Sequence, residues 1–365
     1  MTLRRATAHP PSSSPDGSGP LLSAGPIGPA HEVTGPARAA AWNARPMITV
    51  PEGLRRSVAG AEGGDEWLEA LPALVARAAK RWRLTLGRPF EDGMSAWTAP
   101  VTAPAGALAV LKISYPHREA QHEAAALRVW AGSGAVQILD SHEDDWALLL
   151  ARCTPGTALR DERLEDFEHV RIGAELMERM ATATVPVGGP FPTLVRVAAG
   201  LADIASERID RLVGSAPIPL DRGFLVHAVD LLRTLPLGAP REGLAHGDLN
   251  PGNILRDDSG GAARWVAIDP KVVIGDPAWD PWPLITQVGD WATAVTPAGV
   301  LAERTRLLAD LTGLNGARIA AWSTARGVES ALWAANRGWW TGFRGLDGEV
   351  ARAQAWATAT TILGG

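Results

Sequence analysis

The sequence predicts an α+β fold with two lobes: a small N-terminal lobe built on an antiparallel sheet with one helix, and a larger, mainly helical C-terminal lobe. Two observations lead to this prediction. Short apolar runs broken by Gly, Pro and Asp, which are typical of antiparallel strands, occupy residues 82–152. After Cys153, long segments carry apolar residues at helical spacing instead. A chain of 365 residues is long enough for two such lobes.

The first 46 residues differ from the rest of the chain. They are rich in Pro, Gly, Ser and Ala and show no apolar periodicity, so residues 1–46 are predicted to form a disordered tail. A folded domain is expected to start at Met47, which is also an alternative start of translation. We place the N-terminal lobe at residues 47–152 and the C-terminal lobe at residues 153–365.

The individual elements follow from local patterns. From Pro51 to about Arg83 the spacing predicts helical structure with one apolar face, made of Trp67, Leu68, Leu71, Leu74 and Val75. One further helix, from about His117 to Trp130, interrupts the strands of the N-terminal lobe. In the C-terminal lobe, amphipathic helices are predicted within residues 155–182, 194–213 and 221–235, a strand pair within 244–270, and more helices to the end.

Composition excludes several classes of function. The hydrophobic share of 46% and charged share of 21% are those of an ordinary soluble globular protein, for which we expect a cytoplasmic location. The net charge of −5 and the lack of a Lys/Arg-rich run argue against a nucleic-acid partner. No stretch approaches the roughly 20 apolar residues of a membrane span. With Cys153 as its one cysteine, the chain can form no internal disulfide and no zinc knuckle. The oligomeric state stays open.

The most informative pattern lies between residues 243 and 280. It contains His246-Gly247-Asp248, then Asn253 five residues after the aspartate, and two predicted antiparallel strands that lead to Asp269. Asp and Asn are common in turns, so the first motif alone is weak. The whole order, however, matches that of the protein-kinase motifs. Asp248 is therefore the predicted catalytic base, and Asn253 and Asp269 are the predicted ligands of Mg²⁺, a hard ion that prefers oxygen.

This segment resembles a known family. HGDLNPGNIL followed by WVAIDPKVVIGDPAWD is similar to the catalytic segment of the aminoglycoside/hydroxyurea antibiotic resistance kinases, the group that includes streptomycin 6-phosphotransferases. Their run IDPK-x-x-x-GDPA-x-D reads here from Ile268 to Asp280, with Pro270 in place of the protein-kinase phenylalanine. From Met47 onward, the resemblance implies a protein-kinase-like bilobal fold, use of ATP and Mg²⁺, and a small-molecule hydroxyl as acceptor. It also implies that His246 and Asp280 support the catalytic loop.

A kinase needs a cation for the nucleotide phosphates and a carboxylate that holds this cation. Lys112 in an apolar strand is the predicted cation and Glu123 its predicted partner, with Glu119 as the alternative. A phosphate-covering loop without the GxGxxG pattern is expected near Gly93 and Ser95. Adenine is expected to bind backbone groups of the connection between the lobes, which comprises Ala151, Arg152 and Cys153.

The acceptor is less well defined by the sequence. Four acids of the C-terminal lobe are candidates to face a cationic acceptor, although acids of this kind are more often ordinary surface or capping residues: Asp280, Glu329, Asp347 and Glu349. Lys271 could contact a transferring phosphate or pair with an acid. Three functions remain: a kinase for streptomycin or a similar aminoglycoside, a kinase for hydroxyurea or a sugar-like metabolite, and a nucleotide-binding pseudokinase. The complete set of Lys112, Asp248, Asn253 and Asp269 argues against the third.

Overall fold

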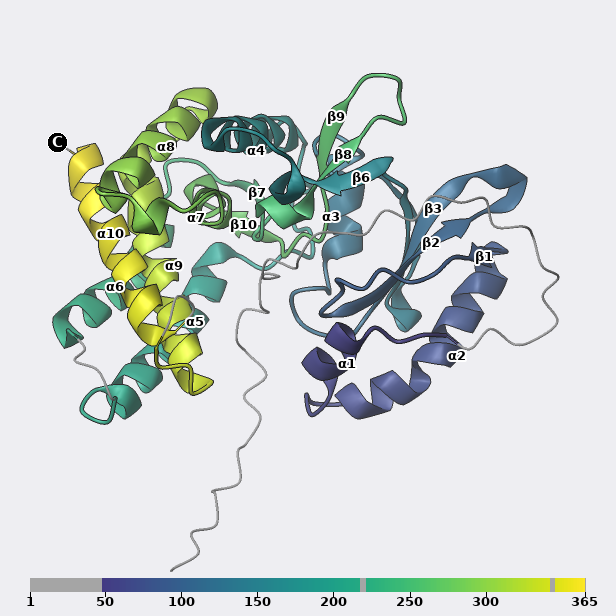
Figure 1. Cartoon of the computed structure of the whole chain (residues 1–365), viewed down its shortest axis with the longest axis horizontal. Coiled ribbons are helices and arrows are strands. Elements are labelled where there is room, and N and C mark those ends of the chain that lie inside the picture. The colour runs from purple at the N-terminus through teal and green to yellow at the C-terminus, as the bar shows by residue number, and fades with distance from the viewer. Residues whose placement is uncertain (1–47, 217–220, 342–344, 365) are drawn as a thin grey trace, which may run out of the picture.

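The computed structural model describes residues 48–216, 221–341 and 345–364. The predicted tail of residues 1–46 and the alternative start at Met47 lie outside the described residues. Figure 1 shows a β-rich N-terminal region and a C-terminal region in which helices dominate, as the sequence predicted. The α+β fold class is thereby confirmed. None of the helices in the described ranges has both the length and the apolar character needed to span a membrane.

The N-terminal region is an antiparallel five-stranded sheet with helices on it. The strand order is β1-β2-β3-β5-β4. The strands are β1 (Thr85–Leu86), β2 (Ala96–Thr102), β3 (Leu108–Ser114), β4 (Ile138–His142) and β5 (Ala147–Ala151). The helices are α1 (Glu52–Val58), α2 (Gly64–Trp82) and α3 (Glu123–Trp130).

Alternation along β3 gives the sheet two different faces. Ala109, Leu111 and Ile113 are fully buried and share a core with α1 and α2. The residues between them point to the opposite face, because successive side chains of a strand alternate. Lys112 therefore lies on the face away from α2, beside its register partner Leu148, which belongs to the core that includes α3. The core that includes α1 and α2 therefore lies on one face of the sheet, and Lys112 lies on the other.

Helix α3 is shorter than predicted. It begins at Glu123, and residues 118–122 form turns in place of the expected first helical turns. The backbone N–H groups of Ala120 and Glu123 donate to carbonyls only three residues earlier, at His117 and Ala120. The prediction that Glu119 lies one helical turn before Glu123 on the same face was therefore wrong.

The C-terminal region contains two small sheets and most of the helices. The sheets are β6-β8-β9 and β10-β7. Their strands are β6 (Pro155–Ala158), β7 (Gly243–Ala245), β8 (Ile254–Asp257), β9 (Arg264–Ala267) and β10 (Val273–Gly275). The helices are α4 (Asp166–Ala181), α5 (Leu194–Leu212), α6 (Arg222–Thr234), α7 (Pro281–Thr286), α8 (Pro297–Thr312), α9 (Gly316–Asn336) and α10 (Leu346–Gly364).

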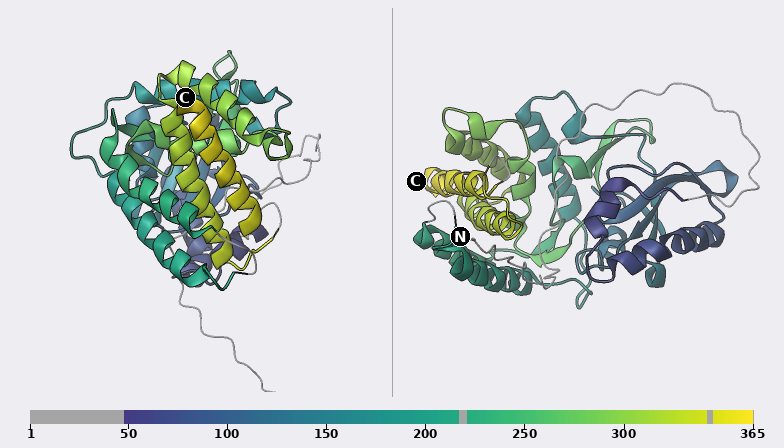
Figure 2. Two further views of the ribbon diagram at one scale, coloured as in Figure 1. Left: turned by 90° about the vertical axis from the view of Figure 1, so that its left-hand side faces the viewer. Right: turned by 60° about the horizontal axis from the view of Figure 1, so that its bottom comes forward.

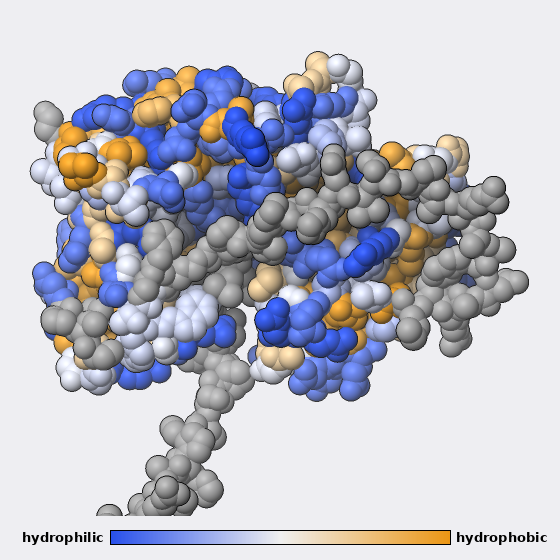
Figure 3. Space-filling model, in the orientation of Figure 1, coloured by the Kyte–Doolittle hydropathy of each residue, from blue (hydrophilic) through white to orange (hydrophobic). Residues whose placement is uncertain are grey.

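One predicted helix is partly a strand. Within residues 155–182 only α4 is an α-helix, because Pro155–Ala158 instead pairs antiparallel with β8, about a hundred residues further along the chain. This long-range pairing gives no signal in local periodicity. At the far end of the molecule, Figure 2 shows α9 and α10 running alongside each other. On the face drawn in Figure 3, hydrophilic and hydrophobic residues are interspersed over both regions.

Candidate functional site

The strand pair β8–β9 brings the predicted metal ligands to neighbouring positions. Ile254 is the register partner of Ala267, and the N–H of Ile268 donates to the carbonyl of Asn253 at 2.9 Å. Asn253 and Asp269 therefore sit at the same end of one hairpin. The expectation of two antiparallel strands with these residues at adjacent ends agrees with this register.

The loop that carries Asp248 runs beside the segment after Asp269. The N–H of Lys271 donates to the carbonyl of His246 at 2.8 Å. Gly247, between His246 and Asp248 in the chain, has a φ of +83°. A Cβ atom at this position would lie 2.0 Å from the Lys271 carbonyl oxygen. Only glycine fits this close approach in a left-handed conformation. The glycine of the HGD motif is therefore required for steric reasons.

Asp280 holds the same loop from the other side. Its Oδ2 accepts from the N–H of His246 at 2.8 Å and its Oδ1 from the N–H of Gly247 at 2.7 Å. Asp280 is 3% exposed, and burial raises its pKa, although the two backbone N–H groups offset part of the rise. A buried carboxylate with two N–H donors is a rigid brace for the loop.

His246 links the loop to the end of the β8–β9 hairpin. The N–H of Asp248 donates to His246 Nδ1 at 3.3 Å, so Nε2 carries the proton and donates to the carbonyl of Ile268 at 3.0 Å. The ring is fully buried and stacks on Trp130 with centroids 6.1 Å apart. Burial lowers the pKa of His246, which favours the neutral ring that this pattern requires. His246 thus holds Asp248 and Ile268 together.

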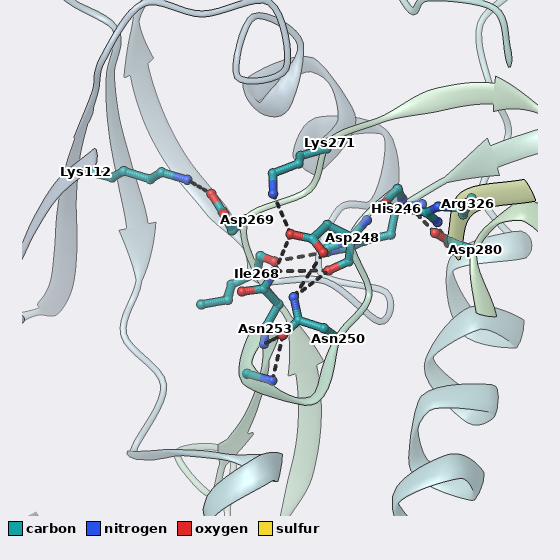
Figure 4. Close-up of polar contacts among 12 residues, drawn as sticks. Lys112, His246, Asp248, Asn250, Asn253, Ile268, Asp269, Lys271, Asp280 and Arg326 are labelled. Carbon is teal, nitrogen blue, oxygen red and sulfur yellow. Dashed lines mark hydrogen bonds and ion pairs between the residues drawn. The ribbon is translucent and has the colours of Figure 1, made fainter. Parts of the chain in front are cut away.

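Three side chains converge on the Asp248 carboxylate (Figure 4). Asn250 Nδ2 donates to Oδ1 at 3.1 Å, Asn253 Nδ2 donates to Oδ2 at 3.3 Å, and Lys271 Nζ donates to Oδ2 at 2.5 Å. Of the two alternatives left open for Lys271, the structure contains the pairing with an acid. Asn250 was missed from the sequence, although an asparagine before Pro-Gly is a turn signal. Its Oδ1 accepts from the N–H of Gly252 and of Asn253 and so shapes the loop.

Lys112 connects the N-terminal sheet to the hairpin. Its Nζ lies 2.8 and 2.7 Å from the two carboxylate oxygens of Glu123 and 2.5 Å from Asp269 Oδ1. Burial alone would lower the pKa of Lys112, but the two carboxylates raise it above its usual value. Burial raises the pKa of Asp269, whereas the charges of Lys112 and Lys271 bring it well below the ordinary range. Lys112 and Asp269 thus form a charged pair between the two regions.

The oxygen atoms at the end of the hairpin fit a hard cation. Asn253 Nδ2 donates to Asp248, so Asn253 Oδ1 is the atom that can bind a metal ion. The Asp269 side chain is 37% exposed. Within residues 48–216, 221–341 and 345–364 no group of three His, Cys, Asp or Glu side chains could hold a metal. One amide and one carboxylate suit Mg²⁺, because this ion keeps several waters and is usually bound by one or two protein carboxylates.

The remaining residues predicted to bind the nucleotide lie at the ends of strands β2 and β5. Gly93 and Ser95 are in the loop that leads into β2, where a Cβ on Gly93 would lie 2.4 Å from the carbonyl oxygen of Ala96. Ala151 ends β5, and Arg152 and Cys153 connect it to β6. Burial raises the pKa of Cys153 to about 12, so the thiol is a poor nucleophile.

The four acids considered for acceptor binding lie at separate places in the C-terminal region. Asp280 is the loop brace. Glu329 is buried and accepts from Arg208 at 3.3 Å, and burial raises its pKa to about 7. Asp347 and Glu349 lie in the first turn of α10, where Glu349 pairs with Arg352.

Glu119 does not pair with Lys112. One of its carboxylate oxygens is buried without a hydrogen-bond partner, and burial raises its pKa. The charges of Lys271 and Asp248 also act on the pKa of Glu119, so this acid lies close to the Asp248 site. The sequence pattern offered no signal for this location, because Glu119 was expected on a helix.

Comparison with known proteins identifies the family. The profile of the aminoglycoside/hydroxyurea antibiotic resistance kinases matches residues 81–338. The chain is 32% identical over 293 residues to a streptomycin 6-kinase of Streptomyces glaucescens, which covers 79% of this chain and 91% of that protein. It is also 32% identical over 309 residues to a hydroxyurea phosphotransferase of Kitasatospora aureofaciens, covering 83% and 82% respectively.

Solved structures share the fold. A choline kinase of Streptococcus pneumoniae matches with a TM-score of 0.55 at 14% identity, covering 79% of this chain and 99% of that one. The sequence resemblance, the family profile and the fold agree. The chain belongs to the aminoglycoside/hydroxyurea antibiotic resistance kinase family of small-molecule phosphotransferases.

Proposed function

We propose that this chain transfers the γ-phosphoryl group of ATP to a hydroxyl of streptomycin or a similar aminoglycoside. The observation that carries the proposal is a pair of polar clusters that meet at one end of the β8–β9 hairpin. Lys112 is bonded to Glu123 and Asp269, and Asp248 is bonded to Asn253 and Lys271. These residue types are the ones that phosphoryl transfer needs, since its catalysis consists mainly of positioning and charge neutralisation.

In this proposal the two regions divide the work. The N-terminal region, residues 47–152, binds ATP: Lys112 contacts the phosphates while Glu123 holds its ammonium group in place. The loop with Gly93 and Ser95 covers the phosphates, and the backbone of Ala151, Arg152 and Cys153 contacts adenine. The C-terminal region, residues 153–365, supplies the acceptor site and the catalytic loop.

Asp248 is the proposed base. It accepts the proton of the acceptor hydroxyl and orients the oxygen toward the γ-phosphorus. Asn253 and Asp269 are the proposed holders of Mg²⁺, which when bound neutralises charge on the phosphate oxygens. His246 and Asp280 keep the loop in this conformation through their hydrogen bonds to backbone groups.

A cationic acceptor is supported by charge near Asp248. Glu119 has a buried carboxylate oxygen without a partner, and its charge also acts on the pKa of Arg326 and Glu329. An amine or guanidinium of the acceptor would supply the missing donor. The similarity to streptomycin 6-kinases at 32% identity points the same way, while the equal identity to a hydroxyurea phosphotransferase makes hydroxyurea the second candidate.

Substitution of the base tests the mechanism. Asp248→Asn keeps the shape of the side chain but removes its basicity, so transfer should fall by roughly two to four orders of magnitude with ATP binding retained. Asp203→Asn is a matched control, because Asp203 is an exposed acid of α5 that pairs with Arg233. A loss of only a few-fold in Asp248→Asn would contradict the assignment of the base.

A panel of acceptors tests the substrate. Streptomycin, other aminoglycosides, hydroxyurea and neutral sugars are compared by ADP release at several salt concentrations. The KM for streptomycin should rise with salt, because the Debye length shortens from about 10 Å at 0.1 M to about 3 Å at 1 M. The KM for hydroxyurea should stay nearly flat. Turnover of hydroxyurea without turnover of any aminoglycoside would favour the second candidate.

A further inference from the structure

Three side chains of α9 lie on one face of the helix and hold the segment after the Asp269 hairpin. Arg318, Trp322 and Arg326 are spaced four residues apart, which places them along one stripe. Arg318 Nε and Trp322 Nε1 both donate to Asp276 Oδ2, at 2.6 and 2.7 Å. Trp322 also packs edge-on against Trp279, with ring centroids 5.1 Å apart. This stripe therefore ties α9 to residues 276–279.

Arg326 extends the stripe to the catalytic loop. One guanidinium nitrogen donates to the carbonyl of Trp279 at 3.0 Å, and another donates to the carbonyl of Gly247 at 3.2 Å. The guanidinium lies 4.1 Å from the ring centre of Trp279 and 4.5 Å from that of Trp282. Figure 4 shows it next to His246 and Asp280. Hydrogen bonds in its plane and rings against it leave the group little freedom.

The contact with Gly247 has a consequence for Asp248. The Gly247 carbonyl and the Asp248 N–H belong to the same planar peptide unit. Arg326 binds the oxygen of this unit, and His246 Nδ1 binds its N–H. Asp280 holds the N–H of Gly247 on the preceding unit. A glycine at φ +83° has no Cβ to restrict its backbone, so these bonds supply the restriction.

We propose that Arg326 is a positioning residue that fixes the Gly247–Asp248 peptide plane and thereby the direction in which the Asp248 carboxylate points. This inference rests on the proposed role of Asp248 as the base. Arginine suits the task because a planar guanidinium donates to two carbonyls while aromatic rings cover it, and a lysine ammonium cannot do both.

The electrostatic setting agrees with this geometry. Burial lowers the pKa of Arg326 to about 10, while the charges of Asp248, Asp280, Glu329 and Glu119 act in the opposite direction. Arg326 is therefore still a cation at neutral pH.

The first test is Arg326→Lys, which keeps the charge but loses the planar fork. The kcat for streptomycin, or for hydroxyurea if that is the better acceptor, should fall roughly 10- to 100-fold, since a misplacement of about 1 Å costs about 10²-fold. The KM for ATP should change less than about three-fold, because Arg326 has no contact with the nucleotide-side residues. A purely structural role would instead lower the folded fraction and leave the kcat per folded molecule unchanged.

Arg337→Lys is the matched control. Arg337 follows α9, is exposed, and stacks over Trp333 at 5.1 Å, so it offers the same kind of arginine–tryptophan contact away from the loop. Its kcat and KM values should equal those of the wild type. If Arg326→Lys retains a kcat within two-fold of wild type, the positioning role is overturned.

A second variant covers the case in which Arg326→Lys does not fold. Trp282→Leu removes one ring from the guanidinium and leaves its hydrogen-bond acceptors in place. The kcat should fall several-fold at an unchanged KM for ATP, and a wild-type kcat would contradict the proposal. Asp248→Asn is measured in parallel. If that variant stays active, both the base assignment and this inference fail, whereas an inactive Asp248→Asn beside a fully active Arg326→Lys overturns the positioning role alone.

Discussion

Lys271 Nζ lies 2.5 Å from Asp248 Oδ2, so the proposed base is ion-paired. Burial alone would lower the pKa of Lys271, but Asp248, Asp269 and Glu119 raise it, and the side chain is charged at neutral pH. The pair sits where the acceptor hydroxyl and the γ-phosphate have to meet under the proposed mechanism.

We therefore expect Lys271→Met to reduce kcat by roughly 10²-fold, the loss typical of removing one charged group at a site of developing charge. The KM for ATP should change little, whereas the melting temperature should fall because Asp248 is left largely buried without its cation. Lys80→Met, at the exposed end of α2, is the control. Steady-state kinetics with both substrates provide the measurement, and a Lys271→Met enzyme with wild-type kcat would rule out a role in the reaction.

Removal of either proposed metal ligand should change the dependence on Mg²⁺. Asn253→Ala and Asp269→Ala each remove one oxygen ligand, so each should raise the Mg²⁺ concentration needed for half-maximal activity. Asn250→Ala is a useful comparison, since Asn250 touches the same Asp248 but is not a proposed ligand. Titration of activity with Mg²⁺ at saturating ATP separates the effects. A ligand variant that titrates like the wild type would remove that residue from the site.

The Lys112–Glu123 pair should affect ATP use more than acceptor use. Lys112→Met should raise the KM for ATP while the acceptor KM stays nearly constant. It should also destabilise the fold, by about 3–5 kcal/mol, because Glu123 would be left buried without its partner. The double variant Lys112→Met/Glu123→Gln should regain much of the stability but none of the ATP binding. Recovery of ATP binding in the double variant would show that Lys112 acts only structurally.

Glu119 should distinguish cationic from neutral acceptors. Glu119→Gln keeps the size of the side chain but removes the charge near Asp248, so the KM for streptomycin should rise about ten-fold, which corresponds to about 1.4 kcal/mol. The KM for ATP should not change. Glu69→Gln on the exposed side of α2 is the control. An unchanged streptomycin KM would place the recognition of its cationic groups elsewhere.

Glu329 should give the protein a specific dependence of stability on pH. Burial raises its pKa in the folded chain from 4.5 to about 7. Between these values the folded state holds a proton that the unfolded state has released, so raising the pH costs up to about 1.4 kcal/mol per unit. The wild type should therefore lose stability relative to Glu329→Gln as the pH rises from about 5 to 7, with no further loss above 7. Denaturant unfolding at several pH values measures this difference, and a constant difference across that window would contradict the assignment.

Much of the site could be read from the chain alone because its signals are local. The alternation in Leu108–Ser114 predicted a strand with Lys112 on it, and the order from Asp248 through Asn253 to Asp269 predicted a hairpin that joins the last two residues at one end. Such patterns report on a strand or a turn without reference to distant parts of the chain. The same segment also carried the resemblance that identified the family.

The tertiary structure decided what depends on contacts between distant segments. Pro155–Ala158 became a strand because β8 offered a partner, and Glu123 rather than Glu119 met Lys112 because the helix starts at Glu123. Lys271 and Asp248 are 23 residues apart, and Arg326 and Gly247 are 79 apart. A sequence determines which elements can form through local periodicity and turn chemistry. Which of their side chains then meet is set by the packing of α9 and of the strand pairs, and that packing has no local signature.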